Sequence, residues 1–398
     1  MLEHNLIQIS KQGITRFHLL LGVGSDQVIK LINESALISS LDITFTIETE
    51  PLGTGGAVIN AIDQLDSFFL LLHGDLVVNT DLSQLKSALM EEKVSVAQFF
   101  HSSSHLVDSD VLVLDEDKFI LRFLLKPRST DIKVRNRTNA GIYAFKKSIL
   151  TNFEWHNKKI DLDRELLPSL LDKGNKFLAV RNTGLIKDIG TSKRLVQMQT
   201  DFQNYPNWQS EKATLFIDRD GTLNIEKGYL KHFSEVELYQ DCIALIKKAN
   251  ELRMNVIVIS NQPVIARGEA SFEDVTRIHA EIDFLLSKED AYVDEYYFCP
   301  HHPDSGFNGE VSSLKIDCNC RKPKLGLFEK ACAEFKIDLS RSFMVGDTWR
   351  DVFAGKAFGL KTVHINRSTE VNFKVGEPDL SLNDLRNLIP AIESMMEA

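Results

Sequence analysis

Leu215-Phe-Ile-Asp-Arg-Asp-Gly-Thr-Leu223 is the stretch that decides the fold of this chain. The apolar and β-branched run from Thr214 to Ile217 predicts a buried strand. It ends in two acids, Asp218 and Asp220, followed by a Gly-Thr turn. Ligands of open α/β sheets bind at the carboxyl ends of strands, and acids grouped there are costly unless a cation neutralises them. The stretch therefore predicts a cation-binding site at a strand end. The alternative is an ordinary strand-to-turn junction at which the two acids have no functional role.

Three later segments supply the other groups that phosphoryl transfer requires. The apolar run from Met254 ends in Ser260-Asn-Gln262, whose hydroxyl and amides can hydrogen-bond a phosphoryl oxygen without adding charge. Arg321-Lys-Pro-Lys324 is a cluster of positive charge, and Ser342-Phe-Met-Val-Gly-Asp-Thr-Trp-Arg-Asp351 is an apolar run closed by acids. An attacking oxygen, a hard cation and positive charge over the phosphoryl oxygens are then all present. Asp351 either supports this site or lies on a solvated helix face.

In sequence and order, these segments resemble the motifs of the haloacid dehalogenase phosphohydrolases. The resemblance implies that Asp218 is the nucleophile, forming an aspartyl-phosphate, and that Asp220 is the general acid and base. It implies that Ser260 and Lys322 hold the transferring phosphoryl group. It also implies Mg²⁺ bound by the Asp218 carboxylate, the Asp220 carbonyl oxygen and Asp347.

Two paired clusters, Cys299-Pro-His-His302 and Cys318-Asn-Cys320, have the composition of a tetrahedral zinc site. The intervening residues are rich in Gly, Ser, Asn and Asp, so a metal clip would give this polar loop an anchor. The predicted ligands are Cys299, His301, Cys318 and Cys320, and His302 is the alternative to His301. Scattered core cysteines beside a surface His pair are the competing interpretation. The remaining cysteines, Cys242 and Cys332, are predicted to be small core residues.

The zinc pattern resembles a subgroup that contains heptose 1,7-bisphosphate phosphatases and histidinol-phosphate phosphatases. The long zinc loop and two segments, Asn224-Ile-Glu-Lys-Gly-Tyr229 and Ser260-Asn-Gln-Pro-Val-Ile-Ala-Arg-Gly268, favour the heptose group. The substrate-binding residues that this resemblance implies are Glu226, Lys227, Gly228, Tyr229, Asn261, Gln262, Pro263, Arg321 and Thr348. The chain departs from the pattern at Pro263-Val264, which replaces Ser-Gly, and at Lys324-Leu-Gly-Leu327, which replaces Pro-Gly-Met. Both departures bear on substrate fit more than on phosphoryl chemistry.

The first half of the chain alternates strand-like and helix-like stretches, which predicts a second α/β domain with a parallel sheet. Strands are expected at Arg16–Gly22, Ile43–Glu48 and Ser67–Leu72, and helices at Gln27–Glu34 and Gly56–Leu65. Four segments in order resemble the sugar nucleotidyltransferases: Glu50-Pro-Leu-Gly-Thr-Gly-Gly-Ala57, Leu72-His-Gly-Asp75, Asn139-Ala-Gly-Ile-Tyr143 and Lys187-Asp-Ile-Gly-Thr191. The resemblance implies that the Gly-rich loop presents backbone amides to a nucleotide base and that Asp75 and Asp188 bind a metal. The corresponding site residues are Gly53, Gly55, Gly56, Asp75, Lys126, Asn139, Gly141 and Asp188.

The nucleotidyltransferase pattern is incomplete. The family opens with a strand and a Gly-rich triphosphate loop, and no segment before Arg16 matches them. Leu125 also stands where the family has a Glu before Lys-Pro. Without the first strand, two strands of the sheet would keep unpaired edges. The sequence therefore predicts that nucleotidyl transfer is absent or very poor, either because the chain start is truncated or because the domain is a remnant.

Length and charge set the outer limits. A chain of 398 residues suits two domains, predicted at 1–200 and 214–398 with a linker at 201–213, where Tyr205 and Trp208 could anchor to one domain. A net charge of −10 argues against a nucleic-acid partner. No apolar run approaches the length of a membrane span, and no signal-peptide core is present. Because the thiols are expected to bind zinc, a reducing cytoplasm is predicted. The oligomeric state stays open.

Three functional hypotheses follow. The leading one is a Mg²⁺- and Zn²⁺-dependent heptose bisphosphate phosphatase that acts on a small sugar phosphate, because a nucleotidyltransferase would consume the heptose 1-phosphate that such a phosphatase releases. The second is a bifunctional enzyme that also binds nucleotide and makes GDP-heptose. In the third, the N-terminal half is a non-catalytic binding module. Histidinol-phosphate phosphatase is the alternative substrate assignment.

Overall fold

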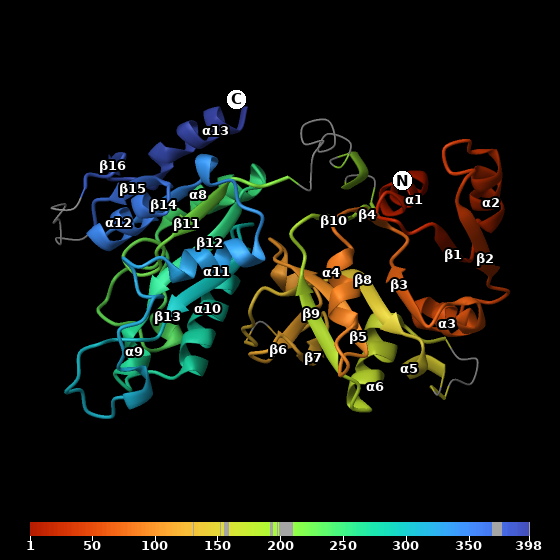
Figure 1. Cartoon of the computed structure of the whole chain (residues 1–398), viewed down its shortest axis with the longest axis horizontal. Helices are drawn as coiled ribbons and strands as arrows, with labels where there is room; N and C mark the ends of the chain where they lie inside the picture. Colours follow the sequence, from red (N-terminus) through yellow and green to blue (C-terminus); the bar gives the residue numbers. More distant parts are fainter. Residues whose placement is uncertain are drawn as a thin grey trace. The chain divides into compact units, whose positions relative to one another are not determined.

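The computed structural model describes residues 1–129, 131–151, 153–154, 159–191, 194–196, 198, 210–367 and 376–397 (Figure 1). The chain divides into two compact units. Unit 1 contains Met1–His101, Leu112–Leu125 and Asn139–Gln209, and unit 2 contains Ser102–Val111, Lys126–Thr138 and Ser210–Ala398. Two segments from the first half of the sequence thus belong to unit 2, unlike the predicted division at 200 and 214.

Most of the predicted linker, including Tyr205 and Trp208, lies outside the described residues. Its last residues, 210–213, belong to unit 2. The backbone N–H of Lys212 donates to the carbonyl oxygen of Lys336 at 3.0 Å, and Ala213 is buried. The chain has therefore joined the core of unit 2 before β11 begins.

The centre of unit 2 is a parallel sheet with the strand order β13-β12-β11-β14-β15-β16. Its strands are β11 (Thr214–Ile217), β12 (Asn255–Asn261), β13 (Glu295–Cys299), β14 (Phe343–Gly346), β15 (Lys361–Ile365) and β16 (Leu380–Leu382). The predicted strand before Asp218 is confirmed to the residue. The chain builds outward from β11 to β13 and then returns to the other side of β11 with β14. This reversal places a topological switch point at β11, where open α/β sheets bind ligands.

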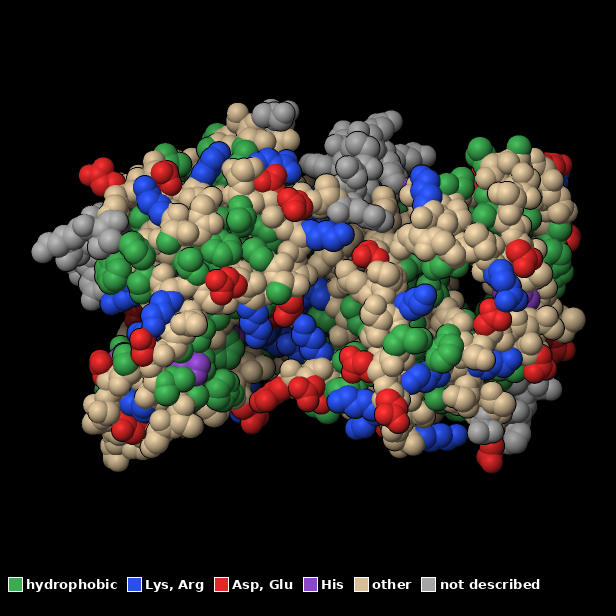
Figure 2. All heavy atoms as spheres, in the orientation of Figure 1, with side chains coloured by type: hydrophobic (Ala, Val, Ile, Leu, Met, Phe, Trp, Pro, Cys, Tyr) green, Lys and Arg blue, Asp and Glu red, His purple; other side chains and the backbone are tan. Residues whose placement is uncertain are grey.

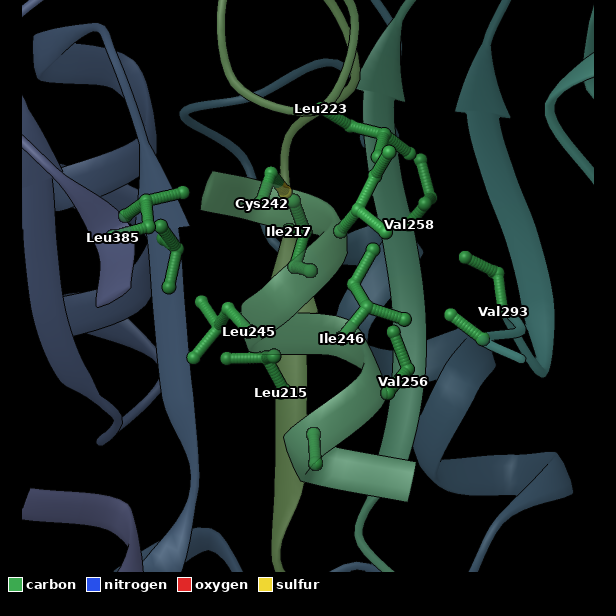
Figure 3. Packing of buried hydrophobic residues seen from close by; sticks show 14 of the residues in the cluster. Leu215, Ile217, Leu223, Cys242, Leu245, Ile246, Val256, Val258, Val293 and Leu385 are labelled. Carbon is green, nitrogen blue, oxygen red and sulfur yellow. The ribbon is translucent and has the colours of Figure 1, made fainter. Parts of the chain in front are cut away.

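Alternation along β11 explains how both faces of this sheet are covered. Leu215 and Ile217 pack in one apolar cluster with α8 (Gln240–Glu251), α10 (Phe272–Ser287) and α13 (Ile389–Glu397). Figure 3 shows part of this cluster, with labelled side chains from β11, α8 and β12. Phe216 points to the opposite face and packs with α11 (Gly326–Glu334) and α12 (Trp349–Ala357). Successive strand residues face opposite sides, so a strand that is apolar throughout needs helices on both.

The cysteine predictions divide. Cys242 on α8 is buried, as expected, whereas Cys332 on α11 is exposed, so its assignment to the core was wrong. On α11 the buried positions are Leu327, Phe328 and Ala331. At about 100° per residue, these three side chains span about 100° of the helix surface, and Cys332 lies about 40° beyond that arc.

The remaining elements of unit 2 are short. They are α9 (Pro263–Ala266) and the 3-10 turns η2 (Leu106–Asp108), η4 (Phe233–Glu235), η5 (Ser312–Leu314), η6 (Leu339–Arg341) and η7 (Leu385–Leu388). Among the helices of the described residues, none combines the length and apolar content that a bilayer crossing requires.

Unit 1 is also α/β, and its sheets mix parallel and antiparallel pairs. Its strands are β1 (Arg16–Leu21), β2 (Asp42–Ile47), β3 (Phe68–Leu72), β4 (Leu76–Asn79), β5 (Val96–His101), β6 (Val111–Leu114), β7 (Ile120–Leu124), β8 (Thr138–Lys146), β9 (Phe177–Arg181) and β10 (Leu185–Asp188). The main sheet has the order β7-β6-β8-β5-β9, with β3 also on β8. The pairs β1·β2 and β5·β9 are parallel, and β3·β8, β6·β8 and β4·β10 are antiparallel.

The helices of unit 1 are α1 (Leu2–Ser10), α2 (Ser25–Glu34), α3 (Gly53–Asn60), α4 (Ser83–Leu89), α5 (Ser148–Thr151) and α6 (Leu167–Asp172), with short turns η1 (Ile62–Gln64) and η3 (Leu162–Leu166). The three predicted strands correspond to β1, β2 and β3 within one residue at each end, and the predicted helix at 27–34 lies within α2. The helix expected at Gly56–Leu65 was misplaced, because α3 begins at Gly53 and ends at Asn60.

The open edges expected in unit 1 are present. Within the described residues, β1 pairs only with β2, and β3 pairs only with β8. Phe68 at the start of β3 and Phe45 on β2 are large apolar side chains left exposed. In the orientation of Figure 1, Figure 2 shows an opening through the surface in the region of β1 and β3. These edges retain unsatisfied pairing capacity.

Candidate active site

The carboxyl ends of β11, β12 and β14 meet at one edge of the unit 2 sheet, because these strands are parallel neighbours. Asp218 follows β11, Ser260 lies near the end of β12, and Asp347 follows β14. All three side chains are buried. The topology thus brings together groups that are far apart in the sequence, as the sequence pattern predicted.

Lys322 reaches this edge from the segment that follows the cysteine cluster. Its Nζ atom lies 2.7 Å from Oδ1 of Asp218, 2.6 Å from Oδ1 of Asp351 and 2.6 Å from the carbonyl oxygen of Ile259. The side chain of Lys322 is only 3% exposed. A single buried ammonium group therefore serves two carboxylates, and Asp347 lies in the same cluster.

The crowding of these acids shifts their protonation. Burial raises the pKa of Asp218 to about 7; Lys322 opposes this shift, and the neighbouring Asp351 adds to it. Burial, together with the charges of Asp218 and Asp351, raises the pKa of Asp347 to about 8. Burial lowers the pKa of Lys322, but the two carboxylates raise it by more, so the ammonium stays charged. The site thus carries more negative charge than one lysine neutralises.

Two glycines allow this close approach. Gly221 has a φ of +81°, and a Cβ atom there would lie 2.3 Å from Oδ2 of Asp347. A Cβ atom on Gly346 would lie 2.3 Å from Cβ of Asp351. Any side chain at either position would displace an acid of the site, and at Gly221 it would also strain the backbone.

The three carboxylates fit a hard divalent cation. Asp218, Asp347 and Asp351 each offer an oxygen, and these atoms lie within 4.8 Å of one another. Carboxylate oxygens are the ligands that Mg²⁺ prefers, and a cation would offset the charge that raises the two pKa values. Asp351 is buried and bound to Lys322, so the solvated-helix alternative for this residue was wrong.

Asp220 turns toward a different set of partners. Nε and Nη2 of Arg219 donate to its two carboxylate oxygens at 2.9 and 2.7 Å. Nε2 of Gln262 donates to Oδ2 of Asp220 at 2.8 Å and to Oγ of Ser260 at 2.7 Å. The carboxylate of Asp220 is thereby held in one orientation beside the buried Asp218.

The predicted substrate residues fall into two groups. Glu226, Lys227, Gly228 and Tyr229 form an exposed loop after β11, and burial together with the charge of Asp220 raises the pKa of Glu226. Arg321 is half-buried and donates to the carbonyl oxygen of His301 at 3.3 Å.

The other four predicted substrate residues support the site from within. The amide of Asn261 clamps the backbone of Lys322 through bonds of 2.9 and 3.0 Å. Pro263 is buried at the start of α9, and Thr348 donates its hydroxyl to Asp351 at 2.6 Å. Gln262 bonds to Asp220 and Ser260, as described above. Their observed contacts are therefore with other side chains or backbone of the site.

The four predicted zinc ligands lie together. The Sγ atom of Cys318 is 3.5 Å from that of Cys299 and 3.3 Å from that of Cys320, and Nδ1 of His301 is 3.2 Å from Sγ of Cys320. Tetrahedral zinc with metal–sulfur bonds of about 2.3 Å has ligand–ligand edges of a little under 4 Å. His302 turns away, with its Nδ1 atom accepting from the backbone N–H of Asp304 at 3.2 Å. The donor set therefore fits zinc.

In unit 1, the structure uses several predicted site groups internally. The backbone N–H groups of Gly55 and Gly56 donate to the carbonyl oxygen of Ile160 at 3.0 and 3.2 Å, so the expectation that they face a nucleotide base is not met. Gly53, with a φ of +76°, also lies against Ile160, whose oxygen a Cβ atom would approach to 2.5 Å. These three glycines pack one loop against another.

The two predicted metal acids of unit 1 lie near each other. The carboxylate oxygens of Asp75 and Asp188 are both within 3.3 Å of the position that a Cβ atom of Gly190 would occupy. Asp188 forms a short ion pair with Arg194. A guanidinium thus occupies part of the coordination space of Asp188. Lys126, the remaining predicted residue of this set, belongs to unit 2.

Asn139 and Gly141 lie in a polar cluster. Nδ2 of Asn139 donates to Oδ1 of Asp163 at 2.8 Å, and Nε2 of His73 lies 3.0 Å from the other oxygen of Asp163. Gly141, with a φ of +72°, makes room for the His73 ring, which a Cβ atom would meet at 2.8 Å. Burial opposes protonation of His73, but Asp163 and nearby acids raise its pKa overall.

Comparison with known proteins identifies both halves. A nucleotidyl transferase family model matches residues 1–204, and a HAD-hydrolase-like model matches residues 319–388. The D-glycero-beta-D-manno-heptose-1,7-bisphosphate 7-phosphatase of Haemophilus ducreyi is 34% identical over 184 residues, which are 46% of this chain and 98% of that protein. The chain joins a nucleotidyl transferase domain to a heptose bisphosphate phosphatase domain. The phosphatase of Escherichia coli K12 is 33% identical over 195 residues, or 46% of this chain and 95% of its own.

Solved structures match each domain separately. HddC from Yersinia pseudotuberculosis, complexed with GMP-PN, is 24% identical with a TM-score of 0.43 and covers 50% of this chain and 85% of its own. The D,D-heptose 1.7-bisphosphate phosphatase of B. bronchiseptica, complexed with magnesium and phosphate, is 25% identical with a TM-score of 0.40 and covers 46% of this chain and 99% of its own. The family model at residues 319–388 and the 34% identity to the Haemophilus ducreyi phosphatase show that the second half of this chain is a HAD-like phosphatase domain.

Sequence reasoning missed two residues of the phosphatase site, Arg219 and Arg267, and left the place of Asp351 open. Asp351 lies with the acids that could hold a metal, and Arg219 binds the carboxylate of Asp220. Arg267 packs its guanidinium over the rings of Tyr229 and Phe307, at 4.2 and 4.5 Å from the ring centroids. For Arg219 the only signal was a charged residue inside a buried motif, and for Arg267 it was its place in the quoted motif at 260–268.

Proposed function

We propose that unit 2 hydrolyses the 7-phosphate of D-glycero-D-manno-heptose 1,7-bisphosphate, in nucleotide-heptose biosynthesis for surface polysaccharide. The observation that carries the substrate is the 34% identity to the Haemophilus ducreyi 7-phosphatase across 98% of that protein's length. The segments Asn224–Tyr229 and Ser260–Gly268 support the same substrate, because they match the heptose group better than the histidinol group. The buried cluster of Asp218, Lys322 and Asp347 supports the phosphoryl chemistry.

In the proposed mechanism, a carboxylate oxygen of Asp218 attacks the phosphorus, and the bond from phosphorus to the sugar oxygen breaks. Asp220 gives its proton to the leaving sugar oxygen. Asp220 then takes a proton from water as the water oxygen attacks the aspartyl-phosphate, the bond to Asp218 breaks, and inorganic phosphate leaves.

The surrounding groups keep the reacting charges in balance. Lys322, bonded to Asp218 at 2.7 Å, orients the nucleophile and places positive charge near the transferring phosphoryl group. Asp218, Asp347 and the carbonyl oxygen of Asp220 would hold Mg²⁺, with Asp351 beside them. When bound, this ion would neutralise charge that develops on the phosphoryl oxygens. Zinc, held by the Cys299 cluster, would anchor the loop that ends at Arg321 and Lys322.

The test is phosphate release in the presence of Mg²⁺ from heptose 1,7-bisphosphate (both anomers), histidinol phosphate and fructose 1,6-bisphosphate. We expect strong preference for a heptose anomer and loss of activity in Asp218→Asn. Asp317→Asn, an exposed acid paired with Lys324, is the matched control and should retain activity. Preference for histidinol phosphate, or equal rates for all substrates, would contradict the proposed substrate.

We also propose that unit 1 performs nucleotidyl transfer poorly or not at all. Two observations support this proposal. The backbone amides of Gly55 and Gly56 are hydrogen-bonded to Ile160, and Arg194 forms an ion pair with Asp188. Incubation with GTP and heptose 1-phosphate should yield little GDP-heptose, whereas robust synthesis would establish a bifunctional enzyme. Binding of GTP or heptose 1-phosphate without turnover would favour a non-catalytic binding module.

A further inference from the structure

Arg135 lies in the part of the sequence that matches the nucleotidyl transferase family, yet it belongs to unit 2. Its Nε atom donates to Oδ2 of Asp283 at 2.9 Å, and its Nη2 atom donates to Oε1 of Glu295 at 3.0 Å. Its guanidinium also lies over the ring of Tyr296, 4.4 Å from the centroid. Asp283 is fully buried and also accepts from the backbone N–H of Asn136. Arg135 therefore connects segment 126–138 to α10 and β13 through two ion pairs and one cation–π contact.

From Tyr296 the contacts continue toward the active site. The ring of His279 stacks on that of Tyr296 with a centroid distance of 4.3 Å and an interplanar angle of 21°. His279 is 1% exposed, and its Nε2 atom lies 3.5 Å from Nη1 of Arg219. Because the guanidinium can only donate, this ring nitrogen must accept and carry no proton. The His279 ring therefore links the two residues: its face contacts Tyr296, and its edge contacts Arg219.

Arg219 is the last residue of the path before the reacting groups. It is fully buried, so it does not meet substrate through solvent. Two of its nitrogens bind the two oxygens of Asp220, and Nη2 also donates to Oε1 of Gln262 at 2.6 Å. A planar guanidinium that binds a carboxylate through two parallel bonds sets its orientation as well as its position. A shift of Arg219 would therefore turn Asp220.

We propose that Arg135 is a positioning residue for the phosphatase reaction, holding Tyr296 and His279 so that Arg219 orients Asp220. The proposal rests on the acid and base role given to Asp220 in the proposed function. Removing Arg135 would leave two acids, Asp283 and Glu295, without their guanidinium partner. The Tyr296–His279 stack would lose the cation on its outer face. A displacement of about 1 Å in a catalytic group can lower a rate by up to about 100-fold.

This role is particular to a chain that carries both domains. The Haemophilus ducreyi phosphatase aligns over 98% of its own length with 46% of this chain. That relative therefore has no room for a counterpart of the nucleotidyl transferase half, where Arg135 lies. In this chain, a residue from one family's region thus completes the support of the other family's active site.

Comparing two substrates with different leaving groups separates a defect in proton transfer from general instability, because instability would lower the rates for both substrates. A sugar alkoxide needs the proton of Asp220 to depart, whereas 4-nitrophenolate departs without it. The constant kcat/KM reports only the steps up to that departure, so it excludes the second half-reaction. We expect Asp220→Asn to lower kcat/KM for the sugar bisphosphate by about 100-fold or more and for 4-nitrophenyl phosphate by much less.

Arg135→Met should reproduce this selectivity in weaker form, with a loss of about 10-fold for the sugar bisphosphate and below about 3-fold for 4-nitrophenyl phosphate. Arg135→Lys, which keeps a charge beside Asp283, should recover part of the loss. Lys133→Met is the matched control: Lys133 lies in the same segment, over the ring of Phe284 at 3.1 Å from its centroid, outside the path to Asp220. It should keep the wild-type ratio between the two substrates.

A double-mutant cycle completes the test. In the Asp220→Asn background, Arg135→Met should cause no further change in the ratio, because both substitutions act on the same proton transfer. An equal loss for both substrates, or a loss that persists in that background, would overturn the proposal and leave Arg135 as a packing residue. If Asp220→Asn itself affects both substrates equally, the role of Asp220 in the proposed function fails instead.

Discussion

Lys322 bonds through one ammonium group to both Asp218 and Asp351, at 2.7 and 2.6 Å. Asp218 follows β11, Asp351 lies in the first turn of α12, and the lysine follows the cysteine cluster in the sequence. One buried cation thus joins the proposed nucleophile, an acid of the candidate Mg²⁺ cluster and the loop that carries the candidate zinc ligands. This arrangement makes the phosphatase site sensitive to the loss of any one of these elements.

Lys322→Met should destabilise unit 2 by about 3–5 kcal/mol, because it leaves buried carboxylates without their cation. Its kcat should fall by about 100-fold or more, because the positive charge near the phosphoryl group is lost. Denaturant unfolding and steady-state kinetics measure the two effects. Lys324→Met is the control, since its pair with Asp317 is exposed and should contribute about 1 kcal/mol or less. Similar losses in both variants would contradict the central role of Lys322.

Mg²⁺ binding should strengthen as the pH rises from 6 to 8. The pKa values of Asp218 and Asp347, about 7 and about 8 without metal, mean that these acids hold protons at the lower pH. A cation favours the ionised carboxylates, so binding releases protons. Calorimetry in buffers of different ionisation enthalpy measures this release. Affinity that does not change over this range would show that the acids are already ionised.

The four predicted zinc ligands should bind one zinc ion per chain, measurable by elemental analysis. Cys318→Ser should abolish zinc binding and lower the melting temperature of unit 2, because the polar loop would lose its anchor. Cys332→Ser alters an exposed cysteine outside the cluster and should leave zinc content and melting temperature unchanged. Full zinc occupancy in Cys318→Ser would rule out this ligand set.

His279 should make the stability of unit 2 depend on pH below about 6.5. Burial, and then the charges of Arg219 and Arg135, hold the pKa of the folded histidine well below its ordinary value. The unfolded chain therefore binds a proton that the folded chain does not, and stability falls as the pH drops below about 6.5. The slope from one such group approaches about 1.4 kcal/mol per pH unit.

His279→Gln should reduce that slope, which denaturant unfolding between pH 5 and 7 measures. His232→Gln is the control, because His232 is exposed in the structure. The comparison uses slopes, so a constant loss of stability in either variant does not affect it. An unchanged slope in His279→Gln would assign the pH dependence to other groups.

Much of the phosphatase site could be predicted from local sequence. The apolar run before Asp218 predicted β11 to the residue, because a buried strand depends on the character of consecutive side chains. The spacing of two cysteine-containing clusters predicted four ligands that the fold brings together. Parallel strands end at one edge, so the groups after β11, β12 and β14 had to converge. The exposed Cys332 shows the limit, because one helix position decides which face a residue occupies.

The sequence by itself therefore determined the two families, several of the strands and the chemical groups at the strand ends. Only the tertiary structure decided which groups contact one another: Asp351 with Lys322 across 29 residues, and Arg135 with Asp283 across 148. It also decided that the amides of Gly55 and Gly56 bond to Ile160 and that segment 126–138 packs within unit 2. Motifs record residue types at fixed spacing along the chain. Partners at long sequence separation depend on how the elements pack, and no local pattern encodes that distance.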